Sequence, residues 1–373
     1  MSKGHFFFAG GGTGGHIYPA IAVAEAIKAA EPAADIHFFC SSRPGDEKIL
    51  SKTGFAFTAL PAKGFSLRPD RLTGFFASFL ASSRIAGQAM GRYQDAVVIG
   101  SGGFVAAPVC LAAYKLKVPT ALLNVDIVPG KANKLIARWL PGIEVFVQFA
   151  DTVGYFKKTV KVHTVGCPLR TNFSNPDPGA MIKELGLDKD KKTLVITGAS
   201  SGSQNINIAV CSLLDRLDSF AESWQIVHLA GRGNFEDVKN RYAGAKISCI
   251  VLDYCDNMSD LLACADLVIG RSGAVSVAEY MAAGVPSICM PYPYHRDRHQ
   301  YLNAGKLVDA GAAVIVDDVA DQTDRCEWLW EELEALMKDS AMREEMRANC
   351  RKIANIDAGR LIARRLLEMA AGR

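Results

Sequence analysis

Short apolar runs alternate with longer amphipathic stretches along almost the whole chain of 373 residues. The runs fall at residues 6–9, 36–40, 96–99 and 120–123, and again at residues 193–196, 225–229, 266–269 and 286–290. A strand that is apolar throughout is buried on both faces, and strands that alternate with helices form parallel sheets. The alternation therefore predicts an α/β protein in which helices cover parallel sheets.

The alternation pauses once, in a polar stretch rich in proline and glycine at residues 172–179. The two halves are similar in length, each opens with a strand, a glycine-containing loop and a helix, and 373 residues suit two domains. We therefore predict two Rossmann-like domains that face each other across a cleft. Their expected bounds are residues 1–170 and 171–355, and a C-terminal helix in residues 356–373 is expected to pack back on the first domain.

The composition excludes several classes of protein. Hydrophobic residues make up 49% of the chain, too many for a mainly disordered protein, and no apolar run approaches the roughly 18 residues of a membrane span. The first residues lack a signal-peptide pattern, so we expect a cytoplasmic protein whose ten scattered cysteines are reduced. His295 and His299 lie four residues apart without the glutamate of an HExxH motif, and we assign no metal site and no cofactor.

The net charge of +3 hides an asymmetry. Residues 1–175 contain 19 Lys and Arg against 10 Asp and Glu, a net charge of +9, whereas the remaining residues carry −6. This distribution indicates an anionic partner or surface for the first half, although ordinary solvated charge explains it equally well.

The first glycine loop, at residues 10–15, lies between a strand and a helix, where ligand phosphates can approach its backbone and the N–H groups of the helix start. Three of its glycines satisfy the GxGxxG dinucleotide motif, but the second strand ends without the acidic residue that holds an NAD ribose. NADP bound through Arg43 stays open. His16 follows the loop and is predicted either to accept a proton in catalysis or to cap the helix.

Two strand–helix junctions in the second half have a similar character. Residues 198–207 are small and polar, which favours an anion site over a tight structural turn. Glu279 lies near the start of a helix, where a carboxylate either binds both hydroxyls of a ribose or stabilises the helix start. The polar segment at residues 294–303 suits recognition of sugar hydroxyls, with a solvated loop as the alternative.

Five motifs occur in the order in which one known family has them. They are residues 11–16, 100–104, 129–134, 271–279 and 297–300. On these residues the chain resembles glycosyltransferase family 28, in particular its peptidoglycan N-acetylglucosaminyltransferases, and the resemblance covers nearly the whole chain. It implies a GT-B fold and inverting transfer of N-acetylglucosamine from UDP-N-acetylglucosamine to an undecaprenyl-linked N-acetylmuramoyl-pentapeptide (lipid I to lipid II), without a required metal.

The resemblance also implies roles for particular residues. In the first domain these are Thr13, Gly14 and Gly15 as donor contacts, His16 near the reaction centre and Arg170 near the donor phosphates. In the second domain they are Ser200 in the loop after the first strand, Cys255 as a backbone contact to uracil, Ala274, Val275, Ser276 and Glu279 at the nucleoside, His299 as a further substrate contact, and Gln300 at the N-acetylglucosamine.

The sequence departs from the family at three places. Asp126 stands where an asparagine contacts the donor, so we consider it both a substrate contact and, beside His16, a candidate general base. The family loop Gly-Gly-Ser-Gln-Gly-Ala becomes Gly-Ala-Ser-Ser-Gly-Ser at residues 198–203, and Cys167 replaces an asparagine. These departures concern the donor sugar and the acceptor more than the fold.

A lipid-linked acceptor requires a membrane-facing surface. Residues 72–80 are apolar and lie beside Arg68, Arg71 and Arg84, and the family has its membrane patch in this region. With the positive first half, this predicts peripheral attachment to the anionic inner face of the cell membrane. An ordinary buried helix is the alternative interpretation. Nucleic acid is not an expected partner.

Two other classes of function stay open on the sequence. One is a GT-B relative with another acceptor, or a UDP-N-acetylglucosamine epimerase, which acts on soluble UDP-sugar. The other is an NADP oxidoreductase or a catalytically silent nucleotide-binding module.

Overall fold

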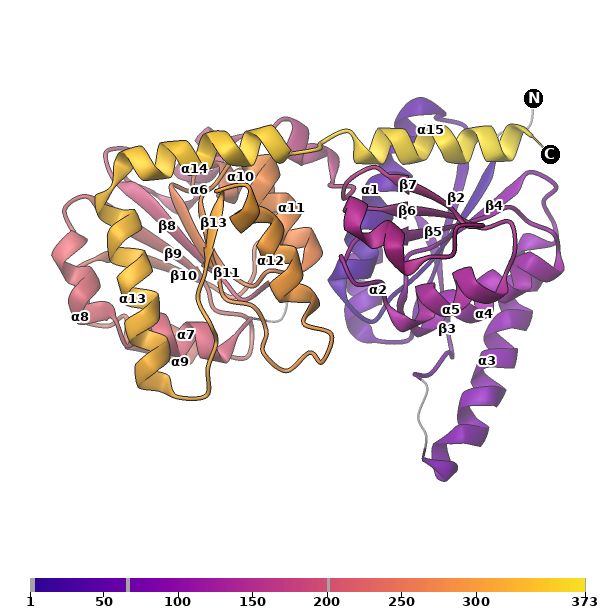
Figure 1. Ribbon diagram of the computed structural model, residues 1–373, viewed down its shortest axis with the longest axis horizontal. Coiled ribbons are helices and arrows are strands. Elements are labelled where there is room, and N and C mark those ends of the chain that lie inside the picture. The colour runs from indigo at the N-terminus through magenta and orange to yellow at the C-terminus, as the bar shows by residue number, and fades with distance from the viewer. Residues whose placement is uncertain (1–3, 65–67, 200–201, 373) are drawn as a thin grey trace. The chain divides into compact units, whose positions relative to one another are not determined.

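The computed structural model describes residues 4–64, 68–199 and 202–372, and the chain divides into two compact units (Figure 1). Unit 1 consists of Met1–Thr171 and Ile356–Arg373, and unit 2 of Asn172–Asn355. The first boundary falls at the beginning of the polar stretch that separates the two halves of the sequence.

Unit 1 is built on a parallel sheet of seven strands in the order β3-β2-β1-β4-β5-β6-β7. The strands are β1 His5–Ala9, β2 Asp35–Ser41, β3 Ala56–Leu60, β4 Ala96–Gly100, β5 Thr120–Asn124, β6 Glu144–Val147 and β7 Lys161–Thr164. The helices are α1 Gly14–Ala30, α2 Pro44–Leu50, α3 Pro69–Met90, α4 Gly103–Lys115, α5 Lys131–Trp139 and α15 Ala358–Ala371, with the 3-10 helix η1 Ala150–Tyr155. A second 3-10 helix, η2 Thr171–Ser174, spans the boundary between the two units.

Unit 2 is built on a parallel sheet of six strands in the order β10-β9-β8-β11-β12-β13. The strands are β8 Lys192–Thr197, β9 Trp224–Leu229, β10 Ser248–Leu252, β11 Leu267–Gly270, β12 Ser287–Cys289 and β13 Ala313–Ile315. The helices are α6 Pro178–Leu185, α7 Gln204–Cys211, α8 Leu214–Leu217, α9 Phe235–Arg241, α10 Met258–Ala263, α11 Ala274–Ala283, α12 His299–Asp309, α13 Gln322–Lys338 and α14 Ser340–Ile353, with the 3-10 helix η4 Asp218–Phe220.

All eight predicted apolar runs form strands, so the predicted α/β class is confirmed. Strands β4, β5 and β11 are buried along their whole length, because helices cover both faces of a parallel sheet. The sequence did not indicate five further strands, namely β3, β6, β7, β10 and β13. Four of these are edge strands and β6 lies next to one, and β3, β7 and β10 are largely half-buried or exposed, which removes the continuous apolar run.

Helix α15 follows α14 of unit 2 in the sequence but belongs to unit 1, where it packs against α1 (Figure 1). Apolar side chains pack between the two helices, and Ala358, Ile362 and Leu366 of α15 are almost fully buried. The guanidinium of Arg365 also donates to both carboxylate oxygens of Glu144 on β6, at 2.5 and 2.9 Å. The C-terminal helix is therefore held by apolar packing and by one paired charge.

Candidate functional site

Except for Arg170, the motifs predicted to act in unit 1 follow three neighbouring strands of its sheet. Ala9 pairs with Gly100, and Gly100 pairs with Leu122, so the loops after β1, β4 and β5 begin at the same edge. The strand order reverses between β1 and β4, and ligands of open α/β sheets bind at such a switch point beyond the carboxyl ends of the strands. The loops after β1 and β4 therefore define the candidate site of this unit.

His16 lies in the first turn of α1, half-buried between these two loops. Its Nδ1 lies 3.2 Å from the backbone oxygen of Gly11, which can only accept a hydrogen bond. A neutral ring with its proton on Nδ1 satisfies that oxygen and leaves the lone pair on Nε2. The geometry therefore assigns Nε2 as the atom of His16 that can take a proton from a substrate.

The loop after β4 approaches His16 so closely that two glycines are required there. Gly102 and Gly103 have φ angles of +108° and +72°, in the left-handed region that favours glycine. A Cβ on Gly102 would lie 3.0 Å from the ring of His16, and one on Gly103 would lie 2.6 Å from the backbone oxygen of Gly11. The two loops and the imidazole thus form one close-packed unit.

A buried carboxylate that the sequence interpretation missed holds the first glycine loop. Asp46 of α2 accepts hydrogen bonds from the backbone N–H of Gly12 at 2.8 Å and from the hydroxyl of Ser41 at 2.5 Å. Its Oδ2 would lie only 2.3 Å from a Cβ on Gly11. The only signal in the sequence was an acidic residue in a short helix directly after a strand, and such residues commonly serve the helix start alone.

Asp46 changes the interpretation of the first loop. The N–H of Gly12 already donates to the carboxylate, and the guanidinium of Arg43 donates to the oxygen of Gly12 at 2.9 Å while it lies over the ring of Phe104. A carboxylate at this position repels the pyrophosphate of a dinucleotide, and Arg43 has partners other than a 2′-phosphate. This geometry opposes the NADP hypothesis and leaves the N–H of Gly12 engaged by Asp46.

The other predicted residues of unit 1 lie at the same edge of the sheet. Thr13 is the exposed N-cap of α1, and Gly14 and Gly15 begin that helix. Asp126 lies in the loop after β5, where Asn124 donates to its backbone oxygen at 2.7 Å. Arg170 follows the edge strand β7, yet its guanidinium lies 5.0 Å from the ring centre of Tyr18 on α1. The structure therefore brings Arg170 to α1, beside Tyr18, which follows His16 by two residues.

The predicted residues of unit 2 also follow the carboxyl ends of its strands. Ala274, Val275 and Ser276 form the first turn of α11, which begins after Gly273. Glu279 lies half-buried in the next turn. These residues follow β11, at the switch point of this sheet.

The start of α12 lies against this segment. The hydroxyl of Ser272 donates to the backbone oxygen of Gln300 at 2.9 Å, and the backbone N–H of Tyr292 donates to the Gln300 side chain at 2.9 Å. His299 places Nδ1 2.7 Å from Asp297. Burial alone would raise the pKa of Asp297, but the hydrogen bond and charge of His299 outweigh it and lower the pKa. The structure therefore brings Gln300 to Ser272, just before α11.

One predicted residue, Cys255, is not brought to that place. Cys255 follows the edge strand β10, which β9 and β8 separate from β11. Ser200 lies outside the described residues. All ten cysteines are free thiols, as expected, and burial raises the pKa of Cys110 to about 12.

The loop after β8 contains a departure with a structural consequence. Ala199 stands where the family has a second glycine, and its φ angle is +60°, a conformation that is unfavourable for a residue with a Cβ. Gly202 has a φ angle of +73°, and a Cβ on it would lie 2.5 Å from the backbone oxygen of Ala230. Gly202 thus packs closely against the backbone of Ala230, and the next residue, Ser203, is the N-cap of α7, where its hydroxyl accepts from the N–H of Ile206.

Models of one protein family match parts of both units. Family models for the glycosyltransferase family 28 N-terminal domain and C-terminal domain match residues 6–144 and 193–359. A protein of Thermoanaerobacter sp. (strain X514), named UDP-N-acetylglucosamine--N-acetylmuramyl-(pentapeptide) pyrophosphoryl-undecaprenol N-acetylglucosamine transferase, is 33% identical over 363 residues, which cover 96% of this chain and 97% of the relative. A protein of the same name from Leuconostoc citreum (strain KM20) is 34% identical over 373 residues, 98% of each chain.

Solved structures also resemble this chain. The crystal structure of Acinetobacter baumannii MurG matches with a TM-score of 0.72 and 24% identity, over 99% of this chain and 100% of that one. An S. aureus MnaA–UDP co-structure matches with a TM-score of 0.68 and 11% identity, over 96% and 94%. At these identities the matches speak for the fold alone, and with the two parallel sheets they confirm the predicted GT-B class.

Proposed function

The chain belongs to glycosyltransferase family 28, and from this we infer that it transfers N-acetylglucosamine from UDP-N-acetylglucosamine to a lipid-linked N-acetylmuramoyl-pentapeptide in peptidoglycan synthesis. The observation that carries this conclusion is the match of relatives named for that reaction at 33–34% identity over nearly the whole chain. Of the alternatives left open by the sequence, the transferase is the one that these relatives support.

We propose that the donor binds mainly at the carboxyl edge of the sheet in unit 2. The loop at residues 198–203 and the start of α7 suit the diphosphate, because N–H groups at a helix start attract anions. The first turn of α11 and Glu279 suit the ribose, and Gln300 and His299 suit the sugar. Cys255 and Ser200 remain proposed contacts on the family resemblance alone.

We propose His16 as the general base, with the loop contacts of Thr13, Gly14 and Gly15 and the guanidinium of Arg170 serving the donor. The acceptor hydroxyl attacks the anomeric carbon with inversion, its proton passes to Nε2 of His16, and the bond to UDP breaks. Fixed N–H groups and Arg170 stabilise the charge that grows on the diphosphate. Asp126, in the loop after β5, is the alternative base.

The test of this function is transfer of radiolabelled N-acetylglucosamine from the UDP-sugar to lipid I. We expect a labelled lipid product that requires the acceptor and whose formation His16→Ala reduces. Conversion of UDP-N-acetylglucosamine without any acceptor would identify an epimerase instead. Absence of labelled product with an intact, folded enzyme would refute the proposed function.

We also propose that α3 attaches the protein to an anionic membrane surface. No helix among the described residues is long and apolar enough to cross a membrane. The N-terminal part of α3 projects from the rest of unit 1 (Figure 1), and its Phe76 and Leu80 are 55% and 64% exposed. Its later turns pack on α4, where Ala86 and Met90 belong to the same buried core as residues of α4. The exposed Phe76 and Leu80 favour the membrane-facing interpretation over the alternative of an ordinary buried helix.

A second exposed apolar pair lies on the neighbouring helix α5. Leu135 and Trp139 are 58% and 69% exposed, and Lys131 and Arg138 on the same helix are exposed cations. Both α3 and α5 pack on α4. Apolar side chains beside cations are typical of surfaces that bind anionic lipid headgroups. The side chain of Arg71 lies outside the described residues, whereas Arg68 and Arg84 are exposed.

A further inference from the structure

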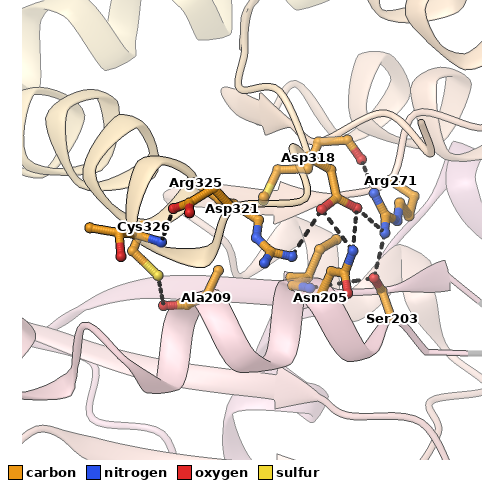
Figure 2. Close-up of polar contacts among 11 residues, drawn as sticks. Ser203, Asn205, Ala209, Arg271, Asp318, Asp321, Arg325 and Cys326 are labelled. Carbon is orange, nitrogen blue, oxygen red and sulfur yellow. Dashed lines mark hydrogen bonds and ion pairs between the residues drawn. The ribbon is translucent and has the colours of Figure 1, made fainter.

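A buried group of charged residues joins four loops at the carboxyl edge of the unit 2 sheet (Figure 2). Its centre is Asp318, after β13, whose side chain is fully buried. One carboxylate oxygen lies 2.8 Å from Nη2 of Arg271, and the other lies 3.1 Å from Nη1 of Arg325. Both guanidiniums are also almost entirely buried. One carboxylate is therefore shared by two positive charges.

The Arg271 guanidinium fixes the position of the α7 start. Arg271 is the first residue after β11, and its Nη2 donates to the hydroxyl of Ser203, the N-cap of α7, at 2.7 Å. Its Nη1 donates to the backbone oxygen of Met290 at 2.8 Å. A planar guanidinium can make these three contacts in fixed directions, whereas an ammonium cannot.

Asp318 holds the same helix a second time. The side-chain amide of Asn205, in the first turn of α7, donates to both carboxylate oxygens at 2.8 and 3.1 Å. Asp318 thus acts on α7 directly through Asn205 and indirectly through Arg271 and Ser203. The segment at residues 272–279 has separate supports, since Tyr280 donates to the Arg271 backbone oxygen and Asn303 donates to the Ser272 backbone oxygen.

We propose that Asp318 and Arg271 are positioning residues for the diphosphate of the donor. They hold Ser203 and the first turn of α7 where the helix N–H groups meet the diphosphate. This inference rests on the proposed function, because it takes the start of α7 as part of the diphosphate site. The segment at residues 272–279, which we propose contacts the nucleoside, keeps its own hydrogen bonds. Loss of Asp318 should therefore weaken binding of the diphosphate rather than of the nucleoside.

The test compares UDP with uridine by calorimetric titration of the full chain. In Asp318→Asn we expect UDP affinity to fall at least about tenfold and uridine affinity to change less than about threefold. We expect the KM for UDP-N-acetylglucosamine to rise more than kcat falls. Arg325→Met is the matched control, because Arg325 contacts the same carboxylate but neither Ser203 nor Arg271 in the described residues. This variant should unfold at a lower temperature but keep the wild-type ratio of UDP affinity to uridine affinity.

Loss of a buried partner is itself destabilising, so Ser203→Ala provides a second, milder variant if Asp318→Asn does not fold. It removes the contact of Arg271 with the N-cap and should also weaken UDP more than uridine. The inference is overturned if a folded Asp318→Asn or Ser203→Ala variant has the wild-type ratio of UDP affinity to uridine affinity. This includes the case in which both affinities fall by the same factor. If the wild-type chain does not bind UDP, the proposed function fails together with this inference.

Discussion

The two ring nitrogens of His16 have different surroundings, and this difference carries the proposed mechanism. Nδ1 faces the backbone oxygen of Gly11, so the hydrogen bond fixes both the ring plane and the position of its proton. Nε2 lies beside Gly102, where the missing side chain leaves room. A base held in this way needs no rearrangement before it accepts a proton.

We expect His16→Ala to lower kcat by roughly 10²- to 10⁴-fold, the usual contribution of a positioned general base. UDP affinity should stay within about threefold of wild type. The measurement is steady-state transfer together with UDP titration, and His37→Ala, on β2, is the control histidine. A kcat within a few-fold of wild type would remove His16 from the role of base and leave Asp126 as the candidate.

A substitution at Gly11 tests whether the buried carboxylate of Asp46 holds the first glycine loop in place. Its backbone is not in the left-handed region, so a Gly11→Ala change acts only through the new methyl group, which would lie 2.3 Å from Oδ2 of Asp46. We expect displacement of the loop and a fall of about 100-fold in kcat/KM, because a shift of about 1 Å in a catalytic group costs that much. Gly154→Ala, with nothing within 4 Å, should have wild-type activity. Equal activity of both variants would contradict the account.

At the scale of elements, the attachment of helix α15 to β6 depends on Glu144. Hydrogen bonds from Arg365, then from His163 and Lys161, lower the pKa of Glu144 to about 2 against the opposing effect of burial. Since this pKa is depressed, the stabilisation is complete above the ordinary value of about 4.5. It is lost as pH falls from there toward 2.

We therefore expect Glu144→Gln to increase hydrogen exchange in α15 at pH 7, relative to wild type at the same pH. The difference between the two proteins should shrink as the pH approaches 2, where the wild-type carboxyl is also protonated. Glu368→Gln is the control, because it removes an exposed partner of the same Arg365, and exposed pairs contribute little. Identical α15 exchange in Glu144→Gln and wild type at pH 7 would refute this role of the ion pair.

The exposed half of α3 gives a second prediction at this scale. We expect the double variant Phe76→Ser, Leu80→Ser to lose most flotation with vesicles that contain phosphatidylglycerol. Partial burial of the two side chains contributes roughly 3 kcal/mol, on the order of a hundredfold in partitioning. Leu361→Ser, an exposed leucine on α15, is the matched control. Flotation that is unchanged in the double variant would exclude α3 as the membrane contact.

At the scale of the whole molecule, the apolar runs were sufficient to predict two parallel α/β units, because central strands are apolar on both faces. Edge strands such as β3 and β10 were not predictable, since solvent reaches one side of them. The glycine loops and Glu279 were identified from local patterns and from the family resemblance. Asp46 and Asp318 were missed because the contacts that give them their roles, to Gly12 and Asn205, span 34 and 113 residues, beyond any local pattern.

The central claim is that backbone N–H groups and fixed side chains of this chain hold a uridine diphosphate without help from a cation. Calorimetric titration of the full-length wild-type protein with UDP, in EDTA and in Mg²⁺, tests it most directly. We expect saturable one-to-one binding with dissociation constants that agree within about twofold in the two buffers. Absence of UDP binding, or binding that appears only with Mg²⁺, would contradict the account.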